Sequence, residues 1–227
     1  MAATRKTTKR PISPKTRSKS KGAKRLSVKK PTVPPVGPVP STDLPSGPLG
    51  FLIVGIGASA GGLEAMEEFF RHMPPASGMA FVVVSHQHAG HVSLLPSLLS
   101  KCTAMPVVEA KDGMVVEPNG VYLAPGGINL AILHGILHLM EPPSQDRVPL
   151  PIDYFFRSLA EDQKQRAVGI VLSGTGSDGT VGLRAIKAES GMTLAQDPPS
   201  AKYQNMPRSA MAAGVVDPLP VKRHAIR

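Results

Sequence analysis

From residue 51 onward the chain alternates short apolar runs with amphipathic stretches. The apolar runs at 51–56, 80–84 and 167–172 have the length and the aliphatic character of strands that are buried on both faces. Because each run is followed by a polar or glycine-rich turn and then by a helix-like stretch, the pattern indicates βαβ units. We therefore predict an α/β fold with a doubly wound, mostly parallel sheet flanked by helices in a Rossmann-like three-layer arrangement.

The remaining elements follow from the spacing of apolar residues and from the turn residues between them. A strand is predicted at 191–196 and a small antiparallel hairpin at 129–133 and 136–140, joined through His134 and Gly135. Short strands are predicted at 106–108 and 121–124. The expected helices cover about 63–73, 93–101, a stretch starting at 152, a stretch starting at 179, and 207–213.

Residues 1–47 differ sharply from the rest of the chain. They hold 12 of the 26 Lys and Arg but only one of the 16 acidic residues, so the part from residue 48 onward carries 14 basic and 15 acidic side chains. A segment this basic and rich in proline buries too little apolar surface to fold, so we predict a disordered tail. We expect one folded domain at 48–220 and a short basic tail at 221–227. Three hypotheses about the long tail remain open: a solvated segment without a specific role, a ligand of nucleic acid or an anionic surface, and an organellar transit peptide, which the density of proline and lysine disfavours.

Bulk properties exclude several classes of protein. The single cysteine, Cys102, cannot form an internal disulfide framework and has no neighbouring histidine to activate it. The sequence has no apolar stretch of roughly 18 residues and no apolar secretory signal at its start. We expect a cytoplasmic protein with one domain.

The turn at 55–62, after the first predicted strand, fits two templates at once. It matches a dinucleotide-binding fingerprint, and its Gly57-x-Ser59-x-Gly61 core matches the nucleophile elbow of serine hydrolases. A dinucleotide site calls for an acidic residue at the end of the second strand, where this chain has Ser85 and His86. A glycine turn with an N-capping serine is the plain structural alternative.

His86 opens a second group of polar residues. If the first two strands are neighbours, their carboxyl ends lie about 5 Å apart, so His86 can reach Ser59 as a general base. Together with His88 and His91 it also forms a His-x-His-x-x-His pattern that resembles a zinc motif. The acidic residue usual before the third histidine is Gly90 here. We expect His88 and His91 to be exposed side chains.

The third polar turn, at 172–179, contains three glycines within six positions and places Asp178 at the start of a predicted helix. Capping of that helix is one sufficient reason for an aspartate. A catalytic role is a second reason for an aspartate here. Ser59, His86 and Asp178 would form a catalytic set drawn from three strand ends at one edge of the sheet.

These residues resemble a known family, the catalytic domain of the CheB-type chemotaxis-receptor methylesterases. The likeness spans about 52–219 and is closest to the form fused to a receptor methyltransferase. It implies that Ser59 is the nucleophile, His86 the general base and acid, and Asp178 the carboxylate that orients the imidazole. It rests on the segments 53–62, 82–86, 120–126, 172–179, 195–197 and 206–208.

The resemblance also implies a substrate and partners. The reaction would be hydrolysis of glutamate γ-methyl esters on the cytoplasmic helices of chemoreceptors, with deamidation of glutamine as an extension and the receptor methyltransferase as a further partner. No metal or organic cofactor would be needed. The backbone N–H groups of Ala60, Gly61, Thr175 and Gly176 are the candidates for oxyanion binding.

Departures from the family pattern concern substrate fit and regulation. Ala60, Ser85 and Thr175 stand where many members have threonine, glutamine and methionine. We also expect no control by phosphorylation within the chain, because the basic tail stands where a receiver domain precedes many members. A non-enzymatic adaptor with the same fold and a dinucleotide-binding oxidoreductase remain the alternatives.

Overall fold

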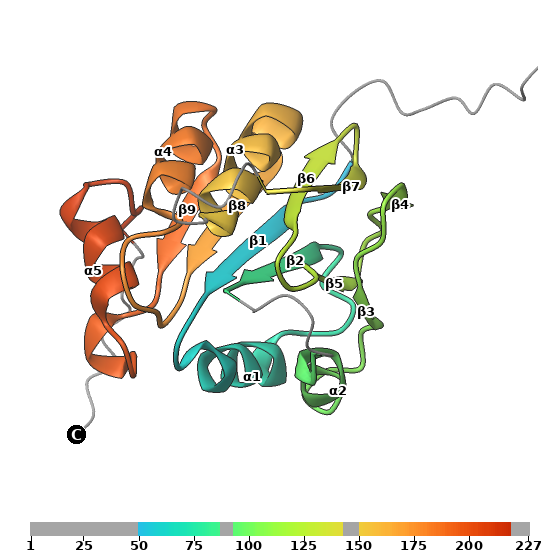
Figure 1. Ribbon diagram of the computed structural model, residues 1–227, viewed down its shortest axis with the longest axis horizontal. Coiled ribbons are helices and arrows are strands. Elements are labelled where there is room, and N and C mark those ends of the chain that lie inside the picture. The colour runs from blue at the N-terminus through green and yellow to red at the C-terminus, as the bar shows by residue number, and fades with distance from the viewer. Residues whose placement is uncertain (1–49, 87–92, 143–149, 219–227) are drawn as a thin grey trace, which may run out of the picture. The chain divides into compact units, whose positions relative to one another are not determined.

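The computed structural model describes residues 50–86, 93–142 and 150–218, which belong to one compact unit. Its centre is a six-stranded sheet in which all neighbouring strands are parallel, in the order β3-β5-β2-β1-β8-β9 (Figure 1). The predicted α/β class and parallel sheet are confirmed. The strands are β1 (Ile53–Ala58), β2 (Ala80–Ser85), β3 (Val107–Glu109), β5 (Val121–Leu123), β8 (Ala167–Val171) and β9 (Met192–Ala195).

Helices cover both faces of this sheet. One face packs against α3, α4 and α5, whereas α1 and α2 lie on the other (Figure 1). Each face forms its own apolar cluster, with Phe155 and Phe156 of α3 in one and Phe70 of α1 in the other. The predicted three layers are therefore present. The helices are α1 (Gly62–His72), α2 (Leu95–Leu99), α3 (Pro151–Gln163), α4 (Thr180–Ala188) and α5 (Asn205–Ala212).

Two glycines in β1 allow α3 to lie directly on the sheet. A Cβ atom at Gly55 would come within 2.8 Å of the Phe156 ring, and one at Gly57 within 2.4 Å of the Ile152 side chain. Both distances are shorter than carbon atoms tolerate, so the contact requires glycine at these positions. Part of the pattern that matched a dinucleotide fingerprint thus has a packing role here.

A second, antiparallel sheet lies beside α3 and contains the predicted hairpin. Strands β6 (Asn129–Leu133) and β7 (Ile136–Met140) pair as expected, and their inward side chains join the core of the α3 face. The sheet has a third strand, β4 (Met114–Val115), which pairs with β7. The expected two-stranded hairpin is therefore incomplete, because a two-residue strand is too short to show an alternating pattern.

The helix predicted at 93–101 is also shorter than expected, since α2 ends at Leu99. Both the backbone N–H and the hydroxyl of Ser100 bond to the carbonyl of Pro96. A side chain that competes for a helical carbonyl in this way favours the end of a helix.

The predicted tails at 1–47 and 221–227 fall outside the described residues. Within the described residues, no helix combines the length and the apolar character that crossing a membrane requires.

Candidate active site

Ser59 lies in the turn between β1 and α1. Its backbone N–H donates to the carbonyl of Ser173 at 3.0 Å, and its own carbonyl accepts from Gly62 N–H at 2.9 Å. Gly61 takes a left-handed conformation, with φ of 68°, which a residue with a side chain rarely adopts. This sharp turn leaves Ser59 half-buried at the start of α1.

His86 follows β2 and reaches both of the other predicted residues. In the parallel register Ala58 pairs with Ser85, so Ser59 and His86 leave the sheet side by side, as expected from the sequence. His86 Nδ1 lies 3.0 Å from Ser59 Oγ, and His86 Nε2 lies 2.8 Å from Asp178 Oδ2. The structure thus brings Ser59, His86 and Asp178 into one hydrogen-bonded chain.

The partners of the imidazole assign its protons. An ionised carboxylate only accepts hydrogen bonds, so Nε2 carries the proton toward Asp178 and Nδ1 is left to accept from the Ser59 hydroxyl. This use of the ring is the reverse of the chymotrypsin arrangement, in which Nε2 faces the serine. The side chain of His86 is 33% exposed, whereas that of Asp178 is 1% exposed.

Asp178 is held by four hydrogen-bond donors. One carboxylate oxygen accepts from His86 and from Ile152 N–H, and the other accepts from Asp153 N–H and Gly179 N–H. Asp178 therefore serves the starts of two helices: it accepts the N–H of Gly179, the N-cap residue of α4, and it also caps the first turn of α3, which was not expected. The cause is tertiary, since α3 and α4 begin next to each other.

Asp153 makes the reciprocal cap, from α3 to α4. The sequence did not single out this residue. It lies in the first turn of α3, and its carboxylate accepts the N–H of Gly182, in the first turn of α4, at 2.7 Å. Each of the two helices is thus capped by an aspartate that lies at the start of the other. Burial raises the pKa of Asp153, and the nearby charge of Asp178 adds to the rise, against the opposing bond from Gly182.

The turn after β8 packs closely against Ser59. A Cβ atom at Gly174 would lie 3.0 Å from Ser59 Cβ and 2.0 Å from Met206 Sδ, so glycine is required there. The N–H of Gly174 is already bonded to the carbonyl of Tyr203 at 3.0 Å, which removes it as an oxyanion donor.

The four predicted oxyanion residues flank Ser59 on two turns. Ala60, Thr175 and Gly176 are exposed and Gly61 is half-buried. Among the described residues, the backbone N–H groups of these four have no hydrogen-bond acceptor. They are therefore available to a ligand.

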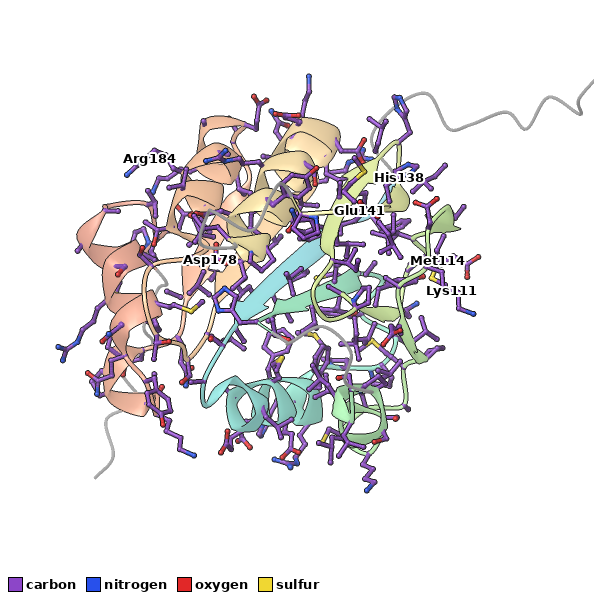
Figure 2. All side chains as sticks on the ribbon, viewed as in Figure 1. Lys111, Met114, His138, Glu141, Asp178 and Arg184 are labelled. Carbon is purple, nitrogen blue, oxygen red and sulfur yellow. The ribbon has the colours of Figure 1, made fainter. Side chains whose placement is uncertain are left out.

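Two histidines of the zinc-like pattern, His88 and His91, lie outside the described residues. His138 lies on the small antiparallel sheet, well away from Asp178 (Figure 2). The described ranges contain no group of three histidine, cysteine or acidic side chains that could hold a metal ion. A hollow of about 800 Å³ lies between α1 and strands β8 and β9 and meets the nucleophile turn at Gly61.

Comparison with known proteins identifies the family of this chain. The family model described as CheB methylesterase matches residues 54–226. The chain belongs to the CheB methylesterase family. The matched range includes Ser59, His86 and Asp178. It also includes all the described strands and helices, apart from Ile53, the first residue of β1.

Relatives with curated names support the same family. A protein-glutamate methylesterase/protein-glutamine glutaminase of Geobacillus kaustophilus is 38% identical over 172 residues, which are 73% of this chain and 49% of the relative. One of Paraburkholderia xenovorans is 35% identical over 187 residues, covering 81% of this chain and 51% of the relative. The chain thus spans about half the length of these relatives.

A solved structure shares the fold. The catalytic domain of the CheB methylesterase of Thermotoga maritima superposes with a TM-score of 0.69 at 30% sequence identity, covering 74% of this chain and 92% of that domain. The chain therefore shares the architecture of the CheB catalytic domain as well as its sequence motifs.

Proposed function

We infer that this chain is a serine hydrolase that removes methyl esters from glutamate γ-carboxyl groups of chemoreceptors. The observation that carries the proposal is the unbroken hydrogen-bonded chain from Ser59 Oγ through His86 to Asp178. Membership of the CheB methylesterase family supplies the substrate class.

The first half of the reaction forms an ester with the enzyme. Ser59 Oγ attacks the carbonyl carbon of the substrate while its proton moves to Nδ1 of His86. Asp178 stabilises the resulting imidazolium through the bond at Nε2. The tetrahedral intermediate then collapses, the proton passes from Nδ1 to the leaving oxygen, and methanol departs.

The second half returns the enzyme to its starting state. A water molecule gives a proton to Nδ1 and attacks the acyl carbon, after which the proton returns to Ser59 Oγ and the glutamate carboxylate leaves. During both attacks the carbonyl oxygen becomes an anion, and the N–H groups of Ala60, Gly61, Thr175 and Gly176 are our candidates to stabilise it.

Deamidation of glutamine is a second activity that the same site supports. Attack on a γ-amide in place of a γ-ester follows the same steps with ammonia as the leaving group, and the curated relatives carry the name protein-glutamine glutaminase as well. We place the protein in the cytoplasm with receptor helices as substrates, and the receptor methyltransferase as a partner that supplies the esters.

Methanol release from methylated receptor membranes tests the proposal. Ser59→Ala removes the nucleophile and His86→Ala removes the base, so each variant should fold normally and lose at least about 10³-fold in rate. His88→Ala and His91→Ala serve as controls and should lose much less. Full activity of Ser59→Ala would overturn the assignment.

The same assay separates the rival functions. An adaptor would bind receptor membranes without releasing methanol in any variant. Hydrolysis that depends on a metal would stop after treatment with a chelator, whereas the triad works without one. A dinucleotide-binding oxidoreductase would show saturable binding of a nicotinamide dinucleotide, which we expect to be absent.

A further inference from the structure

Ser173 is a fully buried residue that touches the nucleophile turn without belonging to the triad. It follows the end of β8, and its side chain and backbone together are 0% exposed. Its carbonyl accepts the N–H of Ser59, and its own N–H donates to the side chain of Gln196 at 2.9 Å. The backbone of Ser173 is thus fixed on both sides.

The hydroxyl of Ser173 makes two further bonds to separate segments. It donates to the carbonyl of Ala60 at 2.9 Å and accepts the N–H of Tyr203 at 3.0 Å. The hydroxyl oxygen lies closer to the Ala60 carbonyl, at 2.9 Å, than to the Tyr203 carbonyl, at 3.4 Å, so its single proton is assigned to the bond with Ala60. The hydroxyl therefore joins the nucleophile turn to the loop before α5.

The bond to Ala60 fixes the direction of a peptide next to the nucleophile. In a trans peptide the C=O and the following N–H point in opposite directions. Because the carbonyl of Ala60 points at Ser173, the N–H of Gly61 points away from it. In the preceding peptide the carbonyl of Ser59 bonds to Gly62 N–H, so the N–H of Ala60 is likewise turned away from the start of α1.

The contact leaves little room for an alternative arrangement. A Cβ atom at Gly61 would come within 2.9 Å of the Ser173 hydroxyl oxygen. Among the described residues, the Ser173 hydroxyl is the only hydrogen-bond donor to the Ala60 carbonyl. Without that hydroxyl the carbonyl would be unpaired, and the Ala60–Gly61 peptide could rotate, because Gly61 permits other backbone conformations.

We propose that Ser173 is a positioning residue for ester hydrolysis, whose hydroxyl holds the Ala60–Gly61 peptide so that the N–H group of Gly61 meets the oxyanion. The proposal rests on the function inferred above and deepens it, because it names the group that orients one of the candidate donors. Because Ser173 is 0% exposed, it cannot contact a bound substrate itself. Oxyanion bonds strengthen in the transition state, so their loss lowers kcat more than it changes KM.

Steady-state kinetics on a receptor peptide with a glutamate γ-methyl ester test this role. Ser173→Thr and Ser173→Val have nearly the same shape, but only threonine retains the hydroxyl. We expect Ser173→Thr to keep most of kcat and Ser173→Val and Ser173→Ala to lose about 10²-fold, with KM little changed, as for removal of one oxyanion donor.

Ser158→Ala is the matched control for lost stability. The Ser158 hydroxyl also bridges two segments, since it donates to Phe155 and accepts from Ile132, but it lies between α3 and the small sheet. It should lower the unfolding temperature without a comparable loss of kcat. Assays are run below the lowest unfolding temperature of the set, so that every variant is compared in its folded state.

The outcomes distinguish a failure of the positioning role from a failure of the proposed function. If Ser173→Val and Ser173→Ala keep kcat near that of Ser158→Ala, or if only KM rises, the positioning role is wrong while the triad assignment stands. If Ser59→Ala still releases methanol from the same peptide, the proposed function itself fails.

Discussion

At the residue scale, the site depends on how completely Asp178 is surrounded by donors. Each of its oxygens accepts two hydrogen bonds, and three of the four donors are backbone N–H groups that cannot turn away. A carboxylate suits such a position because it is acceptor-only. The same donors that fix the aspartate therefore also fix the direction of the His86 ring.

Asp178→Asn tests this point. An amide NH₂ group would face backbone donors or the His86 N–H, so the variant should lose about 10³–10⁴-fold in kcat and about 1–3 kcal/mol of unfolding free energy. Kinetics on the ester peptide and denaturant titration measure both. Asp112→Asn is the control, because Asp112 faces His138 at 3.6 Å on the small sheet and is 70% exposed. A loss below tenfold in kcat for Asp178→Asn would contradict the role given to it.

The sequence predicted the triad but not the residues that support it. Ser59, His86 and Asp178 stand directly after strands or before helices, where residue type and position in the pattern already indicate chemistry. Asp153 and Ser173 act across contacts between segments far apart in the chain. An aspartate in the first helical turn and a serine after a strand are too common to reveal such roles.

At the element scale, α3 and α4 are joined at their first turns by the two crossed aspartate caps. The helices also approach closely there, since a Cβ atom at Gly182 would lie 2.4 Å from Phe156 Cβ and 3.2 Å from Asp153 Cα. The position of Asp178 is thus coupled to the packing of two helices on the sheet.

Gly182→Ala separates packing from helix propensity. In an isolated helix the change would stabilise by about 1 kcal/mol. Here we expect a loss of about 1–3 kcal/mol from overpacking, together with reduced kcat because the helix starts around Asp178 move apart. Val181→Ala, at the neighbouring exposed position, should leave kcat unchanged. A Gly182→Ala variant more stable than the parent would refute the close contact.

The edge strand β9 is tied down by Asp217, whose stabilising effect should depend on pH. Burial alone would raise the pKa of Asp217, but the hydrogen bonds from the Thr193 N–H and hydroxyl and the Lys187 ammonium together lower it. A lowered pKa in the folded state means that the charged form stabilises the fold above the ordinary aspartate pKa and that this effect is lost as the pH falls.

Asp217→Asn should therefore melt lower than the parent at pH 7, by roughly 2–4 °C for each 1 kcal/mol lost. The difference should stay constant down to about pH 5 and shrink below about pH 4, near the ordinary aspartate pKa. Thermal unfolding across this range checks it. A difference that grows on acidification would show that the sign is wrong.

The elements that the sequence predicted best are those with a strong periodic pattern. The bounds of β6 and β7 agree with the predicted hairpin, and the apolar runs of β1, β2 and β8 were placed to within two residues. Two-residue β4 and the early end of α2 were missed, because pairing with β7 and the local bonds of Ser100 determine them.

At the scale of the whole molecule, the parallel sheet explains why distant residues form one site. All six strands run in the same direction, so the segments after β1, β2 and β8 leave the same edge and bring Ser59, His86 and Asp178 together. The folded part from residue 48 carries nearly balanced charge. The basic tail therefore accounts for the net charge of +10, and its role stays a separate hypothesis.

The proposed function depends on attack of Ser59 on the acyl carbon of a glutamate γ-methyl ester. Its most direct test is hydrolysis of a methylated receptor-helix peptide in heavy-oxygen water by the parent chain and by Ser59→Ala, with methanol and peptide analysed by mass spectrometry. We expect the parent to release methanol without label and to leave one heavy oxygen in the glutamate carboxylate, and Ser59→Ala to do neither. Equal methanol release by folded Ser59→Ala, or label in the methanol, would contradict the account.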